Sequence, residues 1–411
     1  NCKPKNLSKY GSKNILDDLI FLKDLNAKAL VVLQDYNGPA LAAANHLNIS
    51  VIKVSVNPQH LAGEFELLGE IHNSVISQRL PTPQDVALIL HTSGTTSKPK
   101  IVPLLHSNIV SSAENIKSSL SLSEDDLCMN IMPLFHIHGL IAALSASIAA
   151  GGSVWCSPGF DALKFFRWLD DASPSWFTAV PTMHQAILAR SKRNKDTIEK
   201  NKLRFLRSSS ASLPSQVMKE LERVFSAPII EGYGMTEATH QMASNPLPPL
   251  VQKPGSVGRE AGPKIRIAHE LENHLIDGTG EVVISGPNVT PGYENNFEAN
   301  KKSFFNFEGE RWFRTGDQGA FDHDGYLSLT GRLKEIINRG GEKISPLEVD
   351  EVLIDHTSVA QVVTFAVPHE KLGEDVAAAL VLEEGSEVTE SDLRAFASGR
   401  TVSYTHLRAH E

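Results

Sequence analysis

The sequence contains no apolar run long enough to cross a membrane. Residues 140–150 are mostly apolar, but this run has only eleven residues and includes two serines, whereas a transmembrane helix needs about 20 apolar residues. An excess of positive charge is also lacking, because the 48 acidic residues outnumber the 39 basic ones and the net charge is −9. The composition therefore argues against a membrane-spanning protein, and against nucleic acid or an anionic membrane as a partner.

Several common catalytic signatures are missing as well. The chain has no G-x-x-x-x-G-K-[ST] phosphate-binding loop, no G-x-S-x-G nucleophile elbow and no H-E-x-x-H zinc motif. Its three cysteines, Cys2, Cys128 and Cys156, are scattered and lack metal-ligand spacing. Cysteines in this pattern indicate a reducing compartment and structural thiols.

The length of 411 residues exceeds the usual limit of a single hydrophobic core, so we expect two or three domains. In the first three hundred residues apolar strand-like runs alternate with helical patterns, which predicts an α/β fold with mostly parallel sheets. The expected strands are 29–33, 51–56, 86–90, 127–132, 176–180 and 204–208, and the expected helices are 39–47, 106–120, one around Leu140, 183–193 and 215–225.

The later part of the chain has a different pattern. Residues 281–285 form a strand-like run, and the segment 320–329 contains a turn that predicts an antiparallel hairpin. Beyond residue 331 the pattern predicts a smaller α+β unit, with a helix at 346–354 and strands at 359–367 and 376–382. We therefore expect a large domain over residues 15–331 and a small domain over residues 332–400.

The most informative stretch is Thr92-Ser-Gly-Thr-Thr-Ser-Lys-Pro-Lys100. It follows the run 86–90, which we expect to be a buried strand, and open α/β sheets hold ligands at the carboxyl ends of their strands. Backbone N–H groups, hydroxyls and lysines suit the phosphates of a nucleotide, although a solvated Ser/Thr loop has the same composition. The predicted phosphate-binding residues are Thr92, Ser93, Gly94, Thr95, Thr96, Ser97, Lys98 and Lys100.

Four further segments follow this loop in order. They are Pro133-Leu-Phe-His-Ile-His-Gly139, Glu231-Gly-Tyr-Gly-Met-Thr-Glu237, Arg314-Thr-Gly-Asp317 and Gly331-Arg-Leu-Lys-Glu-Ile-Ile-Asn-Arg-Gly-Gly-Glu-Lys-Ile-Ser-Pro346. With the first loop they resemble the ordered motifs of the adenylate-forming enzymes, a superfamily that includes acyl-CoA synthetases, peptide-synthetase adenylation domains and firefly luciferase. The resemblance extends from about residue 16 to residue 400, and it implies a large adenylation domain followed by a small mobile domain.

The chemistry of these segments fits a nucleotide site. The Glu237 carboxylate suits Mg²⁺, which binds one or two carboxylates plus substrate phosphates, although an acidic residue at a helix start is also a common structural feature. Asp317 can accept hydrogen bonds from two ribose hydroxyls, or it can belong to an Asx turn. The resemblance implies that Glu237 holds Mg²⁺, Thr236 contacts the phosphate and Asp317 binds the ribose. It assigns to the rest of the nucleotide site Ser210, Ala211, Glu231, Gly232, Tyr233 (stacked on adenine), Arg332 (supporting Asp317) and Lys343.

The resemblance implies acyl activation in two steps. A carboxylate attacks the α-phosphorus of MgATP to give an acyl-adenylate and pyrophosphate, and the thiol of coenzyme A then displaces AMP. Lys334 matches the hinge about which the small domain turns, and Gly340 and Gly341 lack side chains, so a slim pantetheine arm can pass close to the backbone. Such chemistry depends on charge neutralisation and positioning rather than on a protein nucleophile.

The segments expected to hold the acid are residues 207–214, 136–138 and 236–240, and they are polar for a fatty chain. Their hydroxyls and imidazoles suit a second carboxylate, because buried polar groups need partners. The amino-acid sequences of stretches such as 178–184 and 235–240 are similar to those of the oxalate–CoA ligases of plants and fungi. We therefore expect a monomeric ligase that converts oxalate to oxalyl-CoA with ATP, Mg²⁺ and coenzyme A; a medium- or short-chain acyl-CoA synthetase is the alternative. The expected residues of the acyl and CoA pocket are His136, His138, Ser209, His240, Gly340 and Gly341.

The sequence departs from the family pattern at both ends. The family's C-terminal lysine loop, of the type Pro-Lys-Thr-x-x-Gly-Lys, is absent, and residues 401–411 resemble a frame error, so we expect a non-native, disordered tail. Residues 1–14 are off-pattern too, and we expect upstream strands and helices of the large domain to be missing. Two hypotheses stay open beside the ligase, namely an inactive nucleotide-binding fragment and adenylation for a carrier-protein thiol. The expected compartment is cytoplasmic or peroxisomal, without a readable C-terminal address.

Overall fold

The computed structural model describes residues 15–57, 59–61, 63–69, 79–92, 99–398 and 408–409. The chain forms two compact units, residues 1–81 and 82–411. This division falls inside the large domain that the sequence predicts over residues 15–331. Within the described ranges, no helix combines the length and the apolar character that a membrane crossing requires.

The described part of the first unit is a small α/β layer. Its three strands have the order β1-β2-β3, with β1 parallel to β2 and β3 antiparallel to β2. The predicted strands 29–33 and 51–56 and the predicted helix 39–47 are confirmed to within one residue. The elements are α1 (Ile15–Asp24), β1 (Ala29–Leu33), α2 (Pro39–His46), β2 (Ser50–Ser55) and β3 (Glu66–Leu68).

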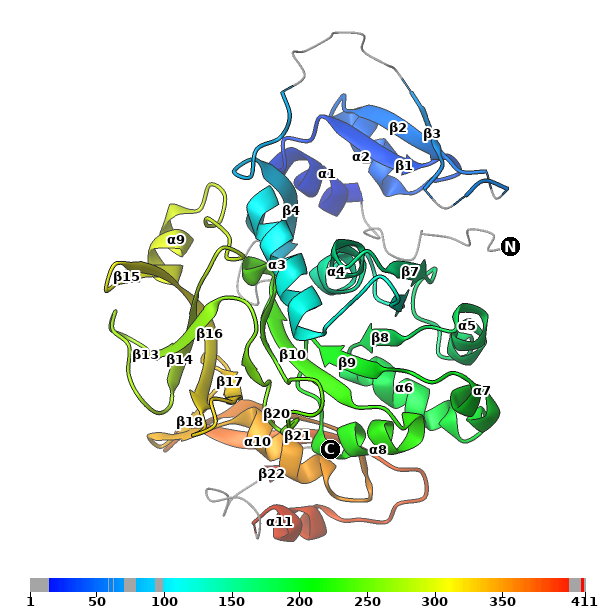
Figure 1. Ribbon diagram of the computed structural model, residues 1–411. Coiled ribbons are helices and arrows are strands. Elements are labelled where there is room, and N and C mark those ends of the chain that lie inside the picture. The colour runs from blue at the N-terminus through cyan, green and yellow to red at the C-terminus, as the bar shows by residue number, and fades with distance from the viewer. Residues whose placement is uncertain are drawn as a thin grey trace. The chain divides into compact units, whose positions relative to one another are not determined.

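A mostly parallel sheet forms the centre of the second unit (Figure 1). Its strand order over the described residues is β12-β11-β10-β9-β8-β6-β7, in which β6 to β10 run parallel and β11 and β12 are antiparallel. The parallel strands predicted from the βα alternation are therefore confirmed. The strands are β6 (Leu127–Asn130), β7 (Ser153–Cys156), β8 (Trp176–Ala179), β9 (Phe205–Ser209), β10 (Ile229–Met235), β11 (His240–Ser244) and β12 (Arg259–Glu260).

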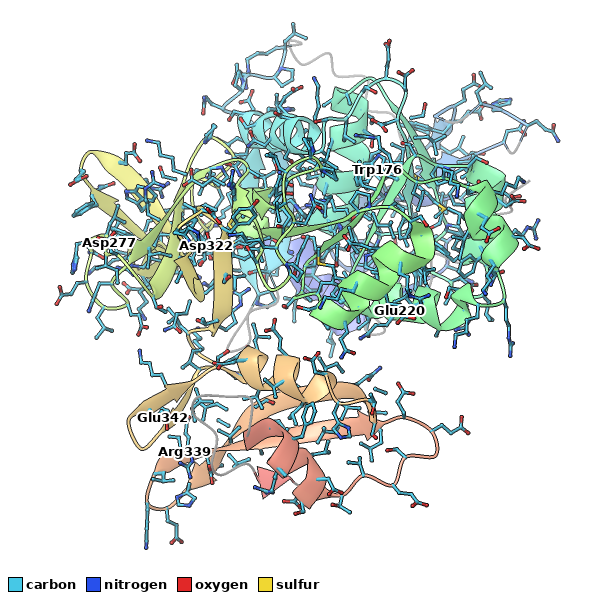
Figure 2. The ribbon with its side chains drawn as sticks, turned by 60° about the horizontal axis from the view of Figure 1, so that its bottom comes forward. Trp176, Glu220, Asp277, Asp322, Arg339 and Glu342 are labelled. Atoms are coloured by element: carbon cyan, nitrogen blue, oxygen red, sulfur yellow. The ribbon has the colours of Figure 1, made fainter. Side chains whose placement is uncertain are left out.

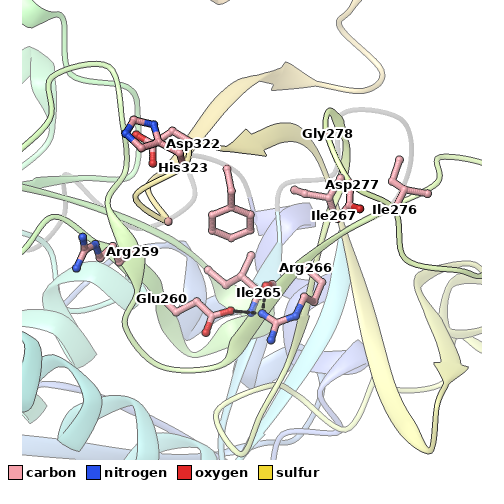
Figure 3. A pocket seen from close by; sticks show the side chains of 12 residues that line it. Arg259, Glu260, Ile265, Arg266, Ile267, Ile276, Asp277, Gly278, Asp322 and His323 are labelled. Atoms are coloured by element: carbon pink, nitrogen blue, oxygen red, sulfur yellow. Dashed lines mark hydrogen bonds and ion pairs between the residues drawn. The ribbon is translucent and has the colours of Figure 1, made fainter.

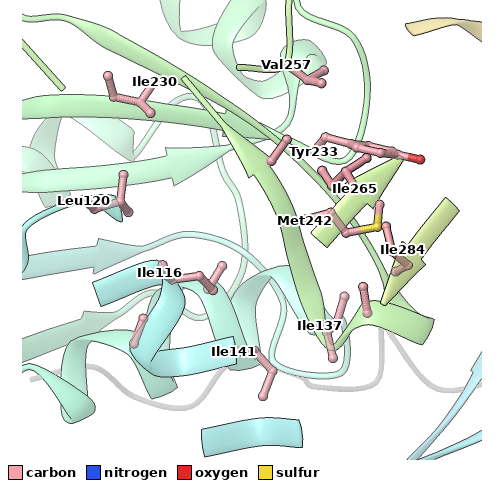
Figure 4. Packing of buried hydrophobic residues seen from close by; sticks show 14 of the residues in the cluster. Ile116, Leu120, Ile137, Ile141, Ile230, Tyr233, Met242, Val257, Ile265 and Ile284 are labelled. Carbon is pink, nitrogen blue, oxygen red and sulfur yellow. The ribbon is translucent and has the colours of Figure 1, made fainter. Parts of the chain in front are cut away.

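Helices cover both faces of this sheet. Successive residues of a strand point to opposite faces, so neighbouring apolar residues of one strand pack in different clusters. Trp176 (Figure 2) packs in one buried cluster with Ile116 and Ile141 (Figure 4), whereas Phe177 packs in a second cluster with Leu221. The predicted helices are confirmed to within two residues, and the one around Leu140 is π-helical. They are α3 (His106–Ser119), η2 (His138–Ser145), α4 (Ala146–Ala149), α5 (Phe165–Ala172), α6 (Pro181–Ser191), α7 (Lys195–Lys200) and α8 (Ser215–Phe225).

The strand before the Ser/Thr loop differs from the sequence prediction. Strand β4 (Val86–Thr92) pairs antiparallel with β5 (Lys100–Leu105), so the loop joins the two arms of a hairpin. The side chains of β4 are exposed or half-buried, and the prediction of a buried strand at 86–90 is wrong. The reason is that an apolar run alone does not show how many faces of a strand are covered.

Strands within residues 264–332 form an antiparallel sheet. Its order is β13-β14-β16-β15, and β17 pairs with β16. Strand β14 confirms the predicted strand at 281–285, and β16 with β17 confirms the hairpin predicted at 320–329. The elements are β13 (Lys264–Ala268), β14 (Gly280–Ser285), α9 (Phe297–Ser303), β15 (Phe304–Phe307), β16 (Glu310–Phe321) and β17 (Leu327–Arg332).

The residues after β17 build a small lobe around a separate hydrophobic core. Ile337 and Val376 of its sheet are buried there together with Val349 and Leu353 of its helix α10. The sheet has the order β19-β18-β21-β20, and Arg339 and Glu342 mark the lobe in Figure 2. The predicted α+β character and the predicted helix at 346–354 are confirmed. The elements are β18 (Ile337–Arg339), β19 (Glu342–Ile344), α10 (Pro346–Ile354), β20 (Val359–His369), β21 (Gly373–Leu382) and α11 (Glu390–Ser398).

Most of the tail that we expect to be disordered, residues 401–411, lies outside the described residues. Within it, Arg408–Ala409 form the short strand β22, which pairs in parallel with Ala377 and Ala378 of β21. At these two residues the structure differs from the expectation of disorder. The backbone groups at a strand edge accept any extended segment, whatever its sequence.

Candidate active site

Glu237 lies on η3 (Thr236–Ala238), a single 3₁₀ turn that begins where β10 ends. Its side chain is buried, and its Oε1 accepts a hydrogen bond of 2.7 Å from the hydroxyl of Tyr293. Nζ of Lys100 lies 4.2 Å from the centre of the Tyr293 ring. The structure therefore brings together two predicted residues, Glu237 and Lys100, through a third that the sequence analysis missed. The available signal was the Pro-Gly-Tyr sequence at 291–293.

The charges in this group affect one another. Burial, followed by the negative charge of Glu237, raises the pKa of Tyr293, so the phenol remains a hydrogen-bond donor. Burial lowers the pKa of Lys100, Glu237 opposes this effect, and the positive charge of Lys334 adds to it. Lys334, the predicted hinge residue, is therefore close enough to influence the Lys100 ammonium.

A hard cation fits the position of Glu237. Mg²⁺ prefers oxygen ligands and is usually held by one or two protein carboxylates plus phosphate oxygens. Over the described ranges, no group of three or more His, Cys, Asp or Glu side chains is placed to hold a metal ion by itself. A cation at the buried Glu237 carboxylate would therefore be shared with the phosphates of a nucleotide.

The predicted phosphate loop is only partly described. Thr92 and Lys100 pair across the β4–β5 hairpin, so both ends of the loop are fixed in the same ladder. The remaining predicted residues of this loop, Ser93, Gly94, Thr95, Thr96, Ser97 and Lys98, lie outside the described residues.

A second polar group joins β10, β16 and β17. The hydroxyl of Tyr233 donates to Oδ2 of Asp317, and Oδ1 of Asp317 lies 2.9 Å from Nε of Arg332. Asp317 and Arg332 are direct cross-strand partners. Burial raises the pKa of Asp317, and the Arg332 guanidinium opposes this effect. The predicted ribose carboxylate and its predicted support are thus neighbours, with Tyr233 as a further donor.

Residues 231–235, which include two glycines, continue strand β10. Gly232 pairs with Ser209 of β9 and with Ser244 of β11. Gly234 is needed for close packing, because a Cβ there would lie 2.0 Å from the carbonyl oxygen of His240. Glycine in a strand interior thus marks close approach of two backbones here.

Glu231, a predicted wall of the adenine pocket, is bonded to the protein. Its Oε1 accepts a hydrogen bond of 2.9 Å from the backbone N–H of Leu213, and burial raises its pKa to about 8. The loop that it supports carries Ser210 and Ala211, which are exposed. In this structure Glu231 therefore shapes the predicted pocket through this loop.

A buried cation lies on β9. Arg207 is fully buried, with Nη1 3.4 Å from Nε2 of His138 and Nη2 3.3 Å from Oε1 of Gln241. Its Nε has no hydrogen-bond partner among the described residues. Burial lowers the pKa of Arg207 to about 10. The sequence places Arg207 at the start of the polar stretch 207–214, which we expect to hold the acid, but it indicates no separate role for the Arg207 side chain.

Two buried histidines complete the cluster around Arg207. The ring centres of His138 and His240 are 5.2 Å apart, and the His138 ring contacts the hydroxyls of Thr178 at 2.6 Å and Ser210 at 3.0 Å. Nδ1 of His240 is buried and unpartnered within the described structure. Burial and the charge of Arg207 lower the pKa of both histidines, so both are neutral. A guanidinium beside neutral imidazoles suits a small anion.

The other residues predicted for the acyl pocket have different surroundings. His136 is exposed, and its Nδ1 accepts a hydrogen bond of 3.2 Å from the backbone N–H of His138. The hydroxyl of Ser209 is buried and donates to the carbonyl oxygen of Gly232 at 2.6 Å. Ser209 therefore serves the strand pairing here, whereas His136 lies at the solvent side of the cluster.

Three predicted residues lie on the β18–β19 hairpin of the small lobe. Gly340 and Gly341 form its turn with φ of +62° and +97°, a backbone conformation that favours glycine. Nζ of Lys343 lies 2.5 Å from Oε2 of Glu270. The structure thus joins Lys343, which we assign to the nucleotide site by resemblance, to an acidic residue after β13.

A cavity of about 650 Å³ lies elsewhere, beside β13 and the β16–β17 hairpin (Figure 3). Ile265, Ile267 and Phe321 line its apolar part, and Arg266 with Asp322 belong to its charged rim. None of the predicted site residues lines this cavity. We therefore do not assign it to the candidate site.

Comparisons with known proteins agree with this geometry. Residues 20–294 match the AMP-binding enzyme family, and residues 348–410 match the AMP-binding enzyme C-terminal domain. An oxalate–CoA ligase of Arabidopsis thaliana is 46% identical over 391 residues, which cover 93% of this chain and 75% of that protein. An oxalate–CoA ligase of Saccharomyces cerevisiae is 46% identical over 321 residues, which cover 78% of this chain and 58% of that protein.

A solved structure extends the comparison to the fold. The ATP-bound MatB of Rhodopseudomonas palustris matches with a TM-score of 0.82 and 26% identity, covering 97% of this chain and 78% of that protein. The predicted α/β architecture, with a large N-terminal and a small C-terminal domain, is confirmed. So is the resemblance carried by the five ordered motifs. This chain belongs to the AMP-binding enzyme family.

Proposed function

We propose that this chain is an ATP-dependent carboxylate–CoA ligase whose acid is oxalate. The observation that carries the choice of acid is the fully buried Arg207 beside His138 and His240. Taking a guanidinium out of water costs several kcal/mol unless an anion accompanies it. The second carboxylate of oxalate would be that anion, and the acid named for the Arabidopsis and yeast relatives agrees.

A fatty acid fits the same cluster poorly. Its methylenes would face Nδ1 of His240 and Nε of Arg207, which have no partners among the described residues. Each buried polar group left unsatisfied costs about 1–3 kcal/mol. A medium-chain acyl-CoA synthetase is therefore the weaker proposal.

The nucleotide would lie against the two groups on β10, β16 and η3. Asp317, held by Tyr233 and Arg332, would accept hydrogen bonds from the ribose hydroxyls. Glu237 and Lys100 would meet the phosphates, the former through Mg²⁺ and the latter directly. Bound Mg²⁺ would neutralise charge on the phosphates, which lowers the repulsion felt by an incoming carboxylate.

The protein's own part in this reaction is to position charges. Arg207 and the two histidines would hold one carboxylate of oxalate, so that the other attacks the α-phosphorus and releases pyrophosphate. Coenzyme A would then displace AMP from the oxalyl-adenylate, and the pantetheine arm would pass Gly340 and Gly341. The hinge role of Lys334, the phosphate role of residues 93–98 and a monomeric state in a cytoplasmic or peroxisomal compartment belong to the same proposal.

Equilibrium binding tests the choice of acid. Oxalate, formate and octanoate would each be titrated calorimetrically into the chain in the presence of AMP. Saturable binding of oxalate, with formate weaker and octanoate absent, is the result expected from a site built for two carboxylates. Binding of octanoate without binding of oxalate would overturn the proposal.

A further inference from the structure

One phenol contacts both a carboxylate and a lysine at the candidate phosphate site. We propose that Tyr293 is a positioning residue, which orients the Glu237 carboxylate toward a divalent cation and holds the Lys100 ammonium beside the phosphates. The inference deepens the proposed function and rests on it, because it concerns how the nucleotide and its cation are held.

The two contacts use different parts of the Tyr293 side chain. Its hydroxyl donates to Oε1 of Glu237 at 2.7 Å, and its ring face lies 4.2 Å from Nζ of Lys100. A direct ion pair between Glu237 and Lys100 would compensate both charges within the protein. Contacts made through a neutral phenol fix both side chains and preserve the charge of each for a cation and for phosphate.

Backbone hydrogen bonds anchor the segment before and after Tyr293 to the same two elements. The N–H of Thr290 donates to the carbonyl oxygen of Glu237 at 2.8 Å, and its hydroxyl donates to that of Pro103 on β5 at 2.7 Å. The N–H of Glu294 donates to the carbonyl oxygen of Ile101 at 3.0 Å. The phenol is therefore held at a fixed distance from η3 and from β5, which carries Lys100.

The side chain of Asn300 on α9 holds the backbone of Tyr293 with two hydrogen bonds. Its Oδ1 accepts a hydrogen bond of 2.7 Å from the Tyr293 N–H, and its Nδ2 donates to the Tyr293 carbonyl oxygen at 2.8 Å. The ring also meets Phe313 edge to face, with ring centres 6.5 Å apart. Backbone, ring and hydroxyl are all fixed, which is what a residue that orients a metal-binding carboxylate requires.

The test is the Mg²⁺ dependence of ATP binding in a Tyr293→Phe variant. This change removes the hydroxyl and keeps the ring against Phe313 and Lys100. ATP affinity would be measured calorimetrically over a series of Mg²⁺ concentrations, with AMP in the absence of Mg²⁺ as a reference. We expect the Mg²⁺ concentration at half-maximal binding to rise about tenfold, while AMP affinity and the melting temperature stay near those of the unmodified chain.

Tyr326→Phe is the matched control. Tyr326 is also buried, its hydroxyl donates to the carbonyl oxygen of Val251 at 2.6 Å, and Nζ of Lys253 lies 4.4 Å from its ring centre. It belongs to the β16–β17 hairpin and does not contact Glu237. The Mg²⁺ dependence of this variant should remain that of the unmodified chain; an equal shift in both variants would overturn the proposal.

A Glu237→Gln background separates positioning from general stability. If Tyr293 acts through the Glu237 carboxylate, Tyr293→Phe adds little to the effect of Glu237→Gln on the Mg²⁺ dependence. Full additivity would contradict the inference. Normal Mg²⁺-dependent ATP binding by Tyr293→Phe would remove the inference alone, whereas failure of the unmodified chain to bind ATP would remove the proposed function as well.

Discussion

Nη1 of Arg207 lies 3.4 Å from Nε2 of His138, and both side chains are fully buried. The guanidinium contributes to lowering the pKa of His138, so the imidazole is neutral. A neutral imidazole does not repel the guanidinium and does not compensate its charge, so the positive charge of Arg207 remains available to an anion. This pair is the basis of the substrate assignment.

Replacing Arg207 with methionine should weaken oxalate binding by a factor of about ten to a hundred, because a hydrogen bond to a charged group contributes about 1.5–3 kcal/mol. ATP affinity should stay within twofold, and calorimetric titration of both ligands measures the two effects. Arg204→Met is the control, since Arg204 pairs with Asp126 at 2.9 Å and does not belong to the buried cluster. Equal losses of oxalate affinity in both variants would contradict the assignment.

His240 is expected to contribute to acid binding more than to nucleotide binding. Its Nδ1 is buried without a partner within the described structure, and its φ is +101°. Asparagine tolerates a left-handed backbone best among polar residues, so His240→Asn removes the ring with little backbone strain. We expect KM for oxalate to rise at least tenfold and KM for ATP to change less than threefold. If the KM values for oxalate and for ATP are both unchanged, His240 does not belong to the acyl pocket.

The carboxylate of Asp317 should matter for every adenine nucleotide. Asp317→Asn weakens the contact with Arg332 at 2.9 Å and replaces a ribose acceptor. ATP and AMP affinities should both fall by roughly tenfold or more, because charge-assisted hydrogen bonds are the stronger ones. Asp322→Asn, at the exposed turn of the same hairpin, should leave both unchanged. A loss of ATP affinity without a loss of AMP affinity would contradict a ribose role.

Burial of Glu231 predicts a pH dependence of stability. Its pKa is about 8 in the folded protein, against an ordinary value of 4.5. Between pH 4.5 and about pH 8, Glu231 keeps its proton in the folded protein and has lost it in the unfolded chain. The stabilisation that comes from the protonated Glu231 is therefore complete below about pH 4.5 and is lost as the pH rises through about 8.

Glu231→Gln removes this titration. The variant should melt near the temperature of the unmodified chain at pH 5 and above it at pH 9, as followed by circular dichroism. Glu220→Gln on the surface of α8 (Figure 2) is the control, and its difference in melting temperature from the unmodified chain should not change between pH 5 and pH 9. A constant difference between Glu231→Gln and the unmodified chain at all pH values would show that the Glu231 proton does not contribute.

The sequence predicts the elements of this fold well where hydrophobic periodicity is local. Helix 215–225 and strand 29–33 have the predicted bounds, because a single apolar face or a short apolar run is enough to define them. The hairpin partner of β4 was not predicted. Pairing of Val86–Thr92 with Lys100–Leu105 depends on what covers each face of the strands, which the local pattern does not show.

The candidate site is predictable in its motifs and less so in its contacts. Asp317, Arg332 and Glu237 were found from ordered motifs, and the structure gives them the buried partners described above. Tyr293 was missed, because it lies in a segment whose local pattern indicates only a turn. Arg207 was included only as the first residue of a polar stretch, without a role of its own. Only the packing of β9 against η2, and of residues 290–294 against η3, gives these two side chains their contacts.

The central claim is best tested by acid-dependent exchange of pyrophosphate into ATP. The assay would compare oxalate, octanoate and benzoate, using this chain and the same chain joined to a segment that carries the family's C-terminal lysine. We predict that oxalate drives exchange in the lysine-bearing protein, and that octanoate and benzoate do not. A folded lysine-bearing protein that ignores oxalate and responds to octanoate or benzoate would contradict the substrate assignment made from Arg207 and its histidines.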